Sequence, residues 1–286
     1  MKPSTSEFAF LRGRRIHLRV WGGASAPRIF LLHGFADVSA SFQFVVDALA
    51  REWRVIAPDW RGFGWSQWNG DAYWSPDYLA DLDALLDQVS PHEPARLVGH
   101  SMGGNIAGLY AGIRPERVAG LVNLEGFGVR PAEPAEAPGR YRKWLSQVRE
   151  EPRFRHYRNR EEYAARLMRD NVRLTPTRAA FLAEHLAEAE QDGVRTAMDP
   201  CHRWVNPVLY RLEEAKACWR EVRCPVLFVR GDDSTYLRDY IAGEEDYRAR
   251  LACFAQVREV LVADCGHNLH HDRPEAVARL IEEFFV

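Results

Sequence analysis

Ser101 lies between two glycines, with a spacing that can position a serine for nucleophilic attack. The segment Gly99-His100-Ser101-Met102-Gly103 has the pattern Gly-x-Ser-x-Gly. A short apolar run precedes it and a helical pattern follows, which predicts a sharp strand-to-helix turn with no room for neighbouring side chains. The start of that helix would place backbone N–H groups and a positive dipole end beside the serine oxygen. We therefore expect Ser101 to act as a nucleophile, with the N–H of Met102 directed at a developing oxyanion.

A serine hydroxyl becomes a good nucleophile when a base removes its proton, so a histidine must reach it. The chain has ten histidines. His267 is the candidate base because it follows the last predicted strand, and Gly266 leaves backbone room for its loop. We expect roles in packing or solvent contact for His270 and His271, and a structural role for His100.

The strands and helices that must position these residues are predicted to alternate along the chain. Short apolar runs alternate with helical patterns, which is typical of parallel strands joined by helical crossovers. After an opening hairpin, strands are predicted at residues 28–33, 54–57, 96–99, 118–124, 225–230 and 257–262. Helices are predicted at residues 39–51, 75–89, 102–113 and 274–285. This order predicts an α/β protein.

Residues 130–216 do not follow this alternation of strands and helices. Prolines mark a linker at the start of this segment, and helical patterns then follow without strands between them. One helix is predicted to open at Thr175 and to end at Gly193. We expect an all-helical cap at residues 130–216, inserted into an α/β core made of residues 1–129 and 217–286.

The composition excludes several classes of protein. The 286 residues are 47% hydrophobic and 27% charged with a formal net charge of -2, as in ordinary globular proteins. This charge gives no support for a nucleic-acid partner, and no apolar run is long enough to span a membrane. The first 21 residues lack the apolar centre of a signal peptide, and the five cysteines form no CxxC pair. We expect a cytoplasmic monomer or homodimer that needs neither a cofactor nor a metal.

Four motifs resemble those of the α/β-hydrolase superfamily, in the order that this family has them. They are His33-Gly34-Phe35, the segment 59–66, the serine motif at 99–103, and the segment 266–274. The resemblance implies an eight-stranded, mostly parallel sheet flanked by helices, with a lid at the position of the predicted cap. It also implies that the backbone N–H of Phe35 joins that of Met102 in an oxyanion hole, and that His33 shapes the loop that carries Phe35 and transfers no proton.

The carboxylate that would orient the catalytic imidazole has two candidate positions in the resembled family. It usually follows the next-to-last strand, but here the expected position holds Ser234, and Asp232 and Asp233 are offset from it. The other position is the end of the preceding strand of the sheet, where Glu125 stands. This placement is similar to that of haloalkane dehalogenases that use a glutamate. We favour Glu125 and keep Asp232 or Asp233 as the alternative acid.

The nucleophile narrows the chemistry. Dehalogenases and epoxide hydrolases of this family attack through an aspartate, so Ser101 argues against both. Acyl transfer to water remains, and we expect hydrolysis of a small or medium carboxylic ester or lactone through an acyl-enzyme. The expected substrate pocket includes His33, Trp65, Trp144 and Trp204.

Two other functions stay open at this stage. Carbon–carbon bond hydrolases of meta-cleavage products are similar in serine, histidine and cap, although they usually carry an asparagine where His100 stands. A receptor with the same fold and the same residues, which hydrolyses its ligand slowly, would look alike in sequence.

Overall fold

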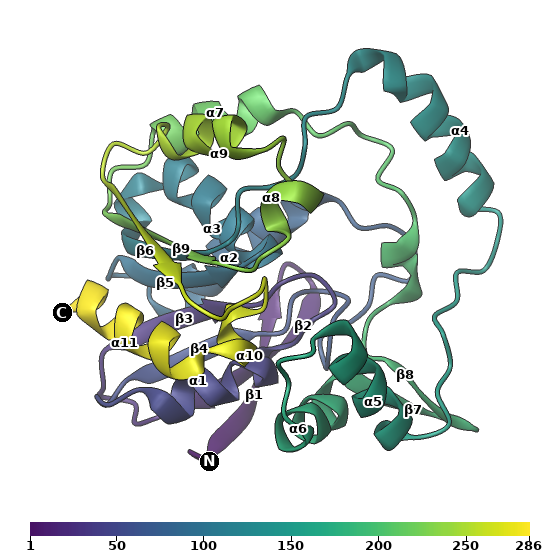
Figure 1. The fold of residues 1–286 in the computed structure, drawn as a ribbon, viewed down its shortest axis with the longest axis horizontal. Helices are drawn as coiled ribbons and strands as arrows, with labels where there is room; N and C mark the ends of the chain where they lie inside the picture. The colour runs from purple at the N-terminus through teal and green to yellow at the C-terminus, as the bar shows by residue number, and fades with distance from the viewer.

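Eight strands form one mostly parallel sheet in the computed structural model, which describes all 286 residues. The order across the sheet is β1-β2-β4-β3-β5-β6-β9-β10 (Figure 1). The strands are β1 (Ser4–Leu11), β2 (Arg14–Trp21), β3 (Arg28–Leu32), β4 (Arg54–Pro58), β5 (Ala95–His100), β6 (Val118–Leu124), β9 (Val226–Gly231) and β10 (Val257–Val262). β2 pairs antiparallel with β1 and β4, and all other pairs are parallel. The predicted fold class is confirmed.

Helices cover both faces of this sheet, because its central strands are apolar on both faces and must be buried from both sides. One apolar core joins the sheet to α2 (Ser75–Val89), α3 (Met102–Ile113), α7 (Leu212–Arg220) and α9 (Glu244–Leu251). The opposite core joins it to α1 (Gln43–Ala48) and α11 (Pro274–Phe285). The remaining core elements are η1 (Ser39–Phe42), η2 (Pro115–Arg117), α8 (Tyr236–Asp239) and α10 (Leu269–Asp272).

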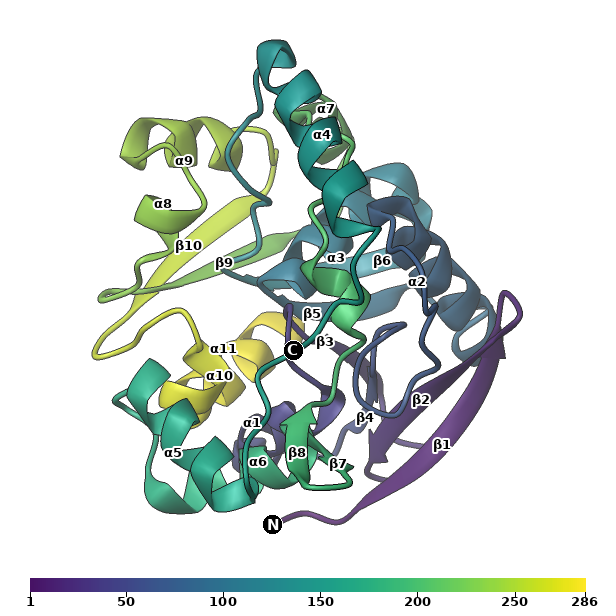
Figure 2. The same ribbon diagram turned by 90° about the vertical axis from the view of Figure 1, so that its right-hand side faces the viewer.

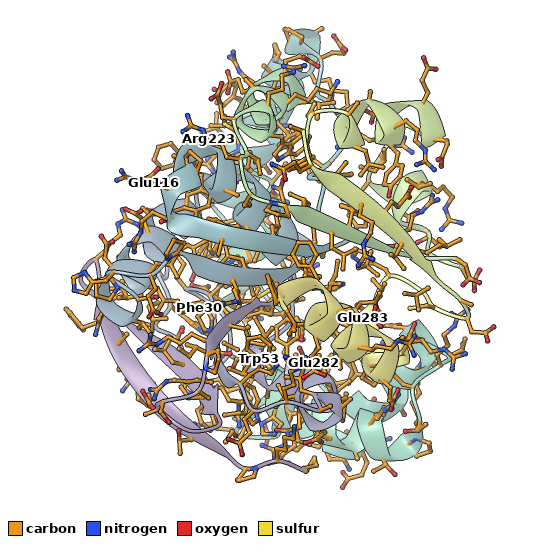
Figure 3. The ribbon with its side chains drawn as sticks, turned by 90° about the vertical axis from the view of Figure 1, so that its left-hand side faces the viewer. Phe30, Trp53, Glu116, Arg223, Glu282 and Glu283 are labelled. Carbon is orange, nitrogen blue, oxygen red and sulfur yellow. The ribbon has the colours of Figure 1, made fainter.

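A carboxylate of the C-terminal helix binds the loop between α1 and β4. Glu282 of α11 accepts hydrogen bonds from the backbone N–H of Arg51, at 2.7 Å, and from the indole N–H of Trp53, at 3.1 Å. Figure 3 shows Trp53 and Glu282 next to each other. The side chain of Phe30 in β3 is fully buried. No helix of the protein is both long enough and apolar enough to cross a membrane.

The segment expected to be an all-helical cap also contains a small antiparallel sheet, so that expectation was wrong in part. Its elements are η3 (Pro134–Glu136), α4 (Ala137–Gln147), α5 (Arg160–Asp170), α6 (Pro176–Leu186), β7 (Ala187–Glu190), β8 (Gly193–Thr196) and η4 (Pro200–Arg203). Helix α6 therefore ends at Leu186, well before Gly193. In Figures 1 and 2, α4 lies apart from the group formed by α5, α6, β7 and β8.

The hairpin replaces the end of the predicted helix because of a tertiary contact. Gly193 has a φ of +146°, and a Cβ there would lie 2.1 Å from the backbone oxygen of Tyr157. The neighbouring Val194 exchanges two backbone hydrogen bonds with Tyr157, at 2.8 and 2.9 Å. Alternating alanine and glutamate favour a helix locally, but these long-range bonds outweigh that weak preference.

Candidate active site

Ser101 occupies the turn between β5 and α3, as its flanking glycines predict. Its backbone has φ 50° and ψ -114°, a conformation that L-residues avoid and that is found where the surrounding structure enforces it. The enforcement is visible in two hydrogen bonds. The backbone N–H of Ser101 donates to the backbone oxygen of Leu124 at 2.9 Å, and the backbone oxygen of Ser101 accepts from the N–H of Asn105 at 2.9 Å.

Two glycines around Ser101 are required by close backbone approach. A Cβ on Gly103 would lie 2.1 Å from the backbone oxygen of Leu32, and a Cβ on Gly99 would lie 2.5 Å from the backbone oxygen of Gly103. Both contacts involve backbone atoms that cannot move aside cheaply. The Gly-x-Ser-x-Gly spacing is thus a packing requirement of the strand, the turn and the adjacent strand β3.

His267 contacts a buried glutamate. Its Nδ1 lies 2.6 Å from Oε2 of Glu125, whose side chain is completely buried. The glutamate also accepts from the N–H of Gly231 at 2.9 Å and from the hydroxyl of Ser234 at 2.6 Å. A carboxylate at Nδ1 keeps a proton on that nitrogen, so the lone pair of Nε2 is available to take the proton of a serine.

The other two candidate acids lie elsewhere. Asp232 accepts from the backbone N–H of Cys265 at 3.1 Å, and such backbone hydrogen bonds lower its pKa. Asp233 pairs with Arg173, and 71% of its side chain is exposed. Neither carboxylate contacts His267, so the structure brings Glu125 to the imidazole and leaves the alternatives at the surface. Ser234, which stands where the acid was first sought, supports Glu125 instead.

Two backbone N–H groups beside Ser101 are free to donate. Neither Phe35 nor Met102 uses its backbone N–H in an internal hydrogen bond, and both residues line the same cavity. Met102 is the first residue of α3, so the helix dipole adds positive partial charge at its N–H.

The Ser101 hydroxyl and His267 are not hydrogen-bonded to each other, and such catalytic contacts often tighten only when substrate binds.

The cavity beside these N–H groups has a volume of about 200 Å³ and is lined mainly by hydrophobic residues, among them five Phe, Tyr or Trp side chains, so we call it the aromatic cavity. Trp144 and Trp204, two of the residues predicted for a substrate pocket, line this cavity. The residues that share it with them are Phe35, Ala72, Tyr73, Ser75, Tyr78, Met102, Cys201, His202, Val205, Asn206 and Pro207. Such a surface suits an apolar group of a substrate.

His202 is a member of this cavity that sequence reasoning missed. Its ring stacks on Tyr73 with 3.5 Å between ring centroids, and its Nε2 lies 2.9 Å from the hydroxyl of Tyr78. Burial lowers the pKa of His202 to about 4, so its imidazole is neutral near pH 7. No motif surrounds it in the sequence, and its position depends on how the cap folds back over the core.

The other two expected pocket residues lie outside this cavity. His33 is fully buried, where its Nε2 accepts from the backbone N–H of Trp60 at 2.9 Å. Its side chain supports the loop that carries Phe35, and burial lowers its pKa. Trp65 is 54% exposed and lies at a separate surface depression, with its ring beside that of His17.

The loops that carry Phe35 and His267 are joined by buried side chains. His100 donates from Nε2 to the backbone oxygen of His267 at 2.9 Å, and burial keeps the pKa of His100 well below its ordinary value. Asp37 and Nε2 of His270 lie 3.1 Å apart, and both side chains are buried. His270 is thus part of an internal polar contact between two loops.

One group of side chains has donor atoms close enough together to hold a metal ion. It consists of Asp37, His270 and His271. These atoms lie within 4.8 Å of one another, and all three residues are buried. Imidazole and carboxylate are ligands that zinc and related ions accept. The hydrogen bond between Asp37 and His270 already gives this cluster a structural role.

The sequence comparisons agree with this architecture. The family model for the alpha/beta hydrolase fold matches residues 27–274. The chain therefore belongs to the alpha/beta hydrolase fold family.

Individual relatives and structures are similar to this chain over different lengths. A serine hydrolase-like protein of Danio rerio is 26% identical over 303 residues, which cover 99% of this chain and 89% of that protein. A 2-hydroxymuconate semialdehyde hydrolase of Pseudomonas sp. (strain CF600) is 38% identical over 110 residues, which cover 37% of this chain and 38% of that protein. The solved thioesterase domain from the curacin biosynthetic pathway has a TM-score of 0.88 and 27% identity, with 98% of this chain and 99% of that chain covered.

Proposed function

We propose that this protein is a serine hydrolase that cleaves a small or medium carboxylic ester or lactone through an acyl-enzyme. The observation that carries the proposal is the contact of 2.6 Å between His267 Nδ1 and the buried Glu125, beside a serine on a strained turn. The similarity to a thioesterase domain over nearly the whole chain supports acyl chemistry.

In the proposed first half-reaction, the hydroxyl oxygen of Ser101 attacks the substrate carbonyl while His267 Nε2 takes the hydroxyl proton. Glu125 stabilises the imidazolium that forms. The N–H groups of Phe35 and Met102 donate to the carbonyl oxygen as it gains charge, and one such donor contributes about 3 to 4 kcal/mol in comparable enzymes. The imidazolium then gives its proton to the leaving oxygen, and the acyl group stays on Ser101.

The second half-reaction releases the acid. His267, now neutral, takes a proton from a water molecule, which attacks the acyl-enzyme carbonyl. The same two N–H groups stabilise the second oxyanion. Return of the proton to Ser101 expels the carboxylic acid and restores the starting state.

Steady-state hydrolysis of p-nitrophenyl esters from acetate to dodecanoate tests the proposal. We expect multiple turnovers by the wild type and loss of turnover in Ser101→Ala. A folded wild-type protein that hydrolyses no ester of the series would contradict the proposal.

Carbon–carbon bond hydrolysis is the second candidate, because one relative is a 2-hydroxymuconate semialdehyde hydrolase. That match covers 37% of the chain, whereas the thioesterase similarity covers 98%. A vinylogous keto acid of the meta-cleavage type, assayed beside the esters, separates the two reactions. Turnover of the keto acid without turnover of any ester would favour this second candidate.

A further inference from the structure

A second and larger cavity meets the small aromatic one. Its volume is about 710 Å³, and it shares Phe35 and His202 with the aromatic cavity. On the core side it reaches His100 and Asn268, the residues that precede Ser101 and follow His267. A substrate whose carbonyl lies at the N–H of Phe35 can therefore extend in two directions, into an aromatic arm and into this larger arm.

The larger arm carries an excess of positive charge from the cap. Three arginines line it, Arg155, Arg166 and Arg203, against two carboxylates, Asp37 and Asp170. Both carboxylates already have partners. Asp170 pairs with Arg166 at 2.7 Å, and Asp37 lies 3.1 Å from His270. The guanidinium groups of Arg155 and Arg203 are left without a carboxylate partner.

These two arginines are exposed, and each lies over an aromatic ring of the same cavity. The guanidinium carbon of Arg155 lies 5.2 Å from the ring centre of Tyr157, and that of Arg203 lies 5.8 Å from the ring centre of Phe154. Tyr157 and Phe154 both line the larger arm. A stacked guanidinium keeps N–H donors at its edge, where they can bind a planar oxyanion in a bidentate way.

Glu162 is a carboxylate whose pKa the charge of Arg155 helps to lower, but its hydrogen bonds are made with Arg158. Glu162 accepts from the backbone N–H of Arg158 at 2.9 Å and from its guanidinium at 3.2 Å, and these bonds lower the pKa of Glu162. Arg203 donates to the backbone oxygen of Arg153, which is uncharged. Neither contact neutralises the positive charge of Arg155 or Arg203.

We propose that the larger arm binds an anionic part of the substrate, a carboxylate or a similar oxyanion, through Arg155 and Arg203. This inference rests on the proposed function, because it names the class of ester that the same site cleaves. One end of the substrate is apolar and fills the aromatic arm, and the other end carries the negative charge.

Matched pairs of esters test the proposal. Mono-p-nitrophenyl glutarate and the p-nitrophenyl ester of glutaric acid monoamide differ only in the charge of the acyl end. The butyrate esters of salicylate and salicylamide differ only in the charge of the leaving group. We expect one or both anionic esters to have a kcat/KM about tenfold above its neutral partner, a preference that 0.5 M NaCl reduces to about twofold or threefold.

The arginine variants assign that preference to the cavity. We expect Arg155→Gln and Arg203→Gln each to lower kcat/KM for the preferred anionic ester about tenfold through KM, and to change the neutral ester less than about twofold. Arg149→Gln is the control, because Arg149 is an exposed cap arginine that does not line this cavity. Equal kcat/KM for charged and neutral esters, or equal effects of all three variants, would overturn the proposal.

Binding to Ser101→Ala separates this inference from the proposed function. Calorimetric titration of this variant with the intact esters measures affinity without turnover. Tighter binding of the anionic ester that is lost in Arg155→Gln/Arg203→Gln supports the anionic arm even if no ester is hydrolysed. Equal affinity for charged and neutral esters overturns it even if both are hydrolysed.

Discussion

The carboxylate of Glu125 and the imidazole of His267 are separated by 142 residues in the sequence and by 2.6 Å in the structure. Glu125 directly follows β6, and His267 follows β10. Ser101 follows β5 in the same way, and the loop of Phe35 follows β3. Because parallel strands end at one edge of a sheet, four segments that are distant in sequence meet there, as ligand sites of open α/β sheets do.

Replacement of Glu125 by glutamine is expected to lower kcat about 10³- to 10⁴-fold with little change in KM, because the imidazole loses the partner that fixes its tautomer and stabilises its charge. Steady-state kinetics with p-nitrophenyl butyrate measures this. Asp232→Asn and Asp233→Asn are the matched controls and should stay within about threefold of the wild type. A larger loss of kcat in either aspartate variant than in Glu125→Gln would show that the acid is that aspartate and not Glu125.

The strained backbone of Ser101 predicts a gain in stability when its side chain is removed entirely. Glycine accepts a φ of 50° without the clash that a Cβ causes, so Ser101→Gly should have a free energy of unfolding about 1 kcal/mol above that of Ser101→Ala. Urea unfolding of the two inactive variants measures the difference. Arg142, an exposed residue in the middle of helix α4, is the control, since glycine should there be about 1 kcal/mol worse than alanine. The same order of stabilities at both positions would show that Ser101 carries no strain.

The contact between Asp37 and His270 is expected to position the two catalytic loops. Asp37 lies two residues after Phe35 and His270 three residues after His267, and the contact is buried. Burial alone would raise the pKa of Asp37, but its hydrogen bond to His270 and the nearby charges of His270, His271 and His33 together outweigh burial and leave the pKa lowered. Asp37→Asn and His270→Gln should each lower kcat about tenfold with little effect on KM.

A double-mutant cycle tests whether Asp37 and His270 act as a unit. The double variant should be no more than about twofold slower than either single variant, because the second substitution removes a contact that is already lost. Asp264→Asn, at an exposed residue that pairs with Arg273, serves as the control and should leave kcat unchanged. Multiplicative losses in the double variant would show that the two residues act separately.

Buried neutral histidines predict that the protein loses stability in mild acid. Burial lowers the pKa of His271 to about 3, whereas the same side chain in the unfolded chain titrates near 6.5. Between these two values the unfolded chain binds a proton that the folded protein does not. The free energy of unfolding should therefore fall as the pH drops below about 6.5, by up to about 1.4 kcal/mol per pH unit for each such histidine.

Urea unfolding at pH 7, 6 and 5 measures this dependence. His271→Gln should make it shallower, because the variant has no imidazole to protonate in the unfolded state. His156→Gln is the control, since His156 is exposed and its contact with Glu190 raises its pKa, which is the opposite sign. An unchanged slope in His271→Gln would show that this histidine does not cause the acid sensitivity.

The strand, turn and helix around Ser101 could be predicted because local pattern and backbone crowding act within a short segment. The predicted helix at residues 102–113 coincides with α3, and β5 differs from its prediction by one residue at each end. The approach of Glu125 to His267 was expected from the resemblance to haloalkane dehalogenases, because the alternation of apolar and helical patterns does not give the order of the strands in the sheet.

The cap could not be predicted to the same depth. Its hairpin depends on backbone bonds between Tyr157 and Val194, which no local pattern announces. His202 and Arg203 line the cavities because of how residues 130–216 pack against the core, which local sequence patterns do not indicate. The hydrogen bond of His270 was missed for a related reason, because a buried polar pair between two loops leaves no periodic signal in either loop.

Activation of Ser101 is tested most directly by labelling with a fluorophosphonate, followed by intact-protein and peptide mass spectrometry. We predict one adduct per chain, on the peptide that contains Ser101, with no adduct in Ser101→Ala and slower labelling in Glu125→Gln. An adduct on another residue, or labelling of Ser101→Ala at the rate of the wild type, would contradict Ser101 as the nucleophile of this protein.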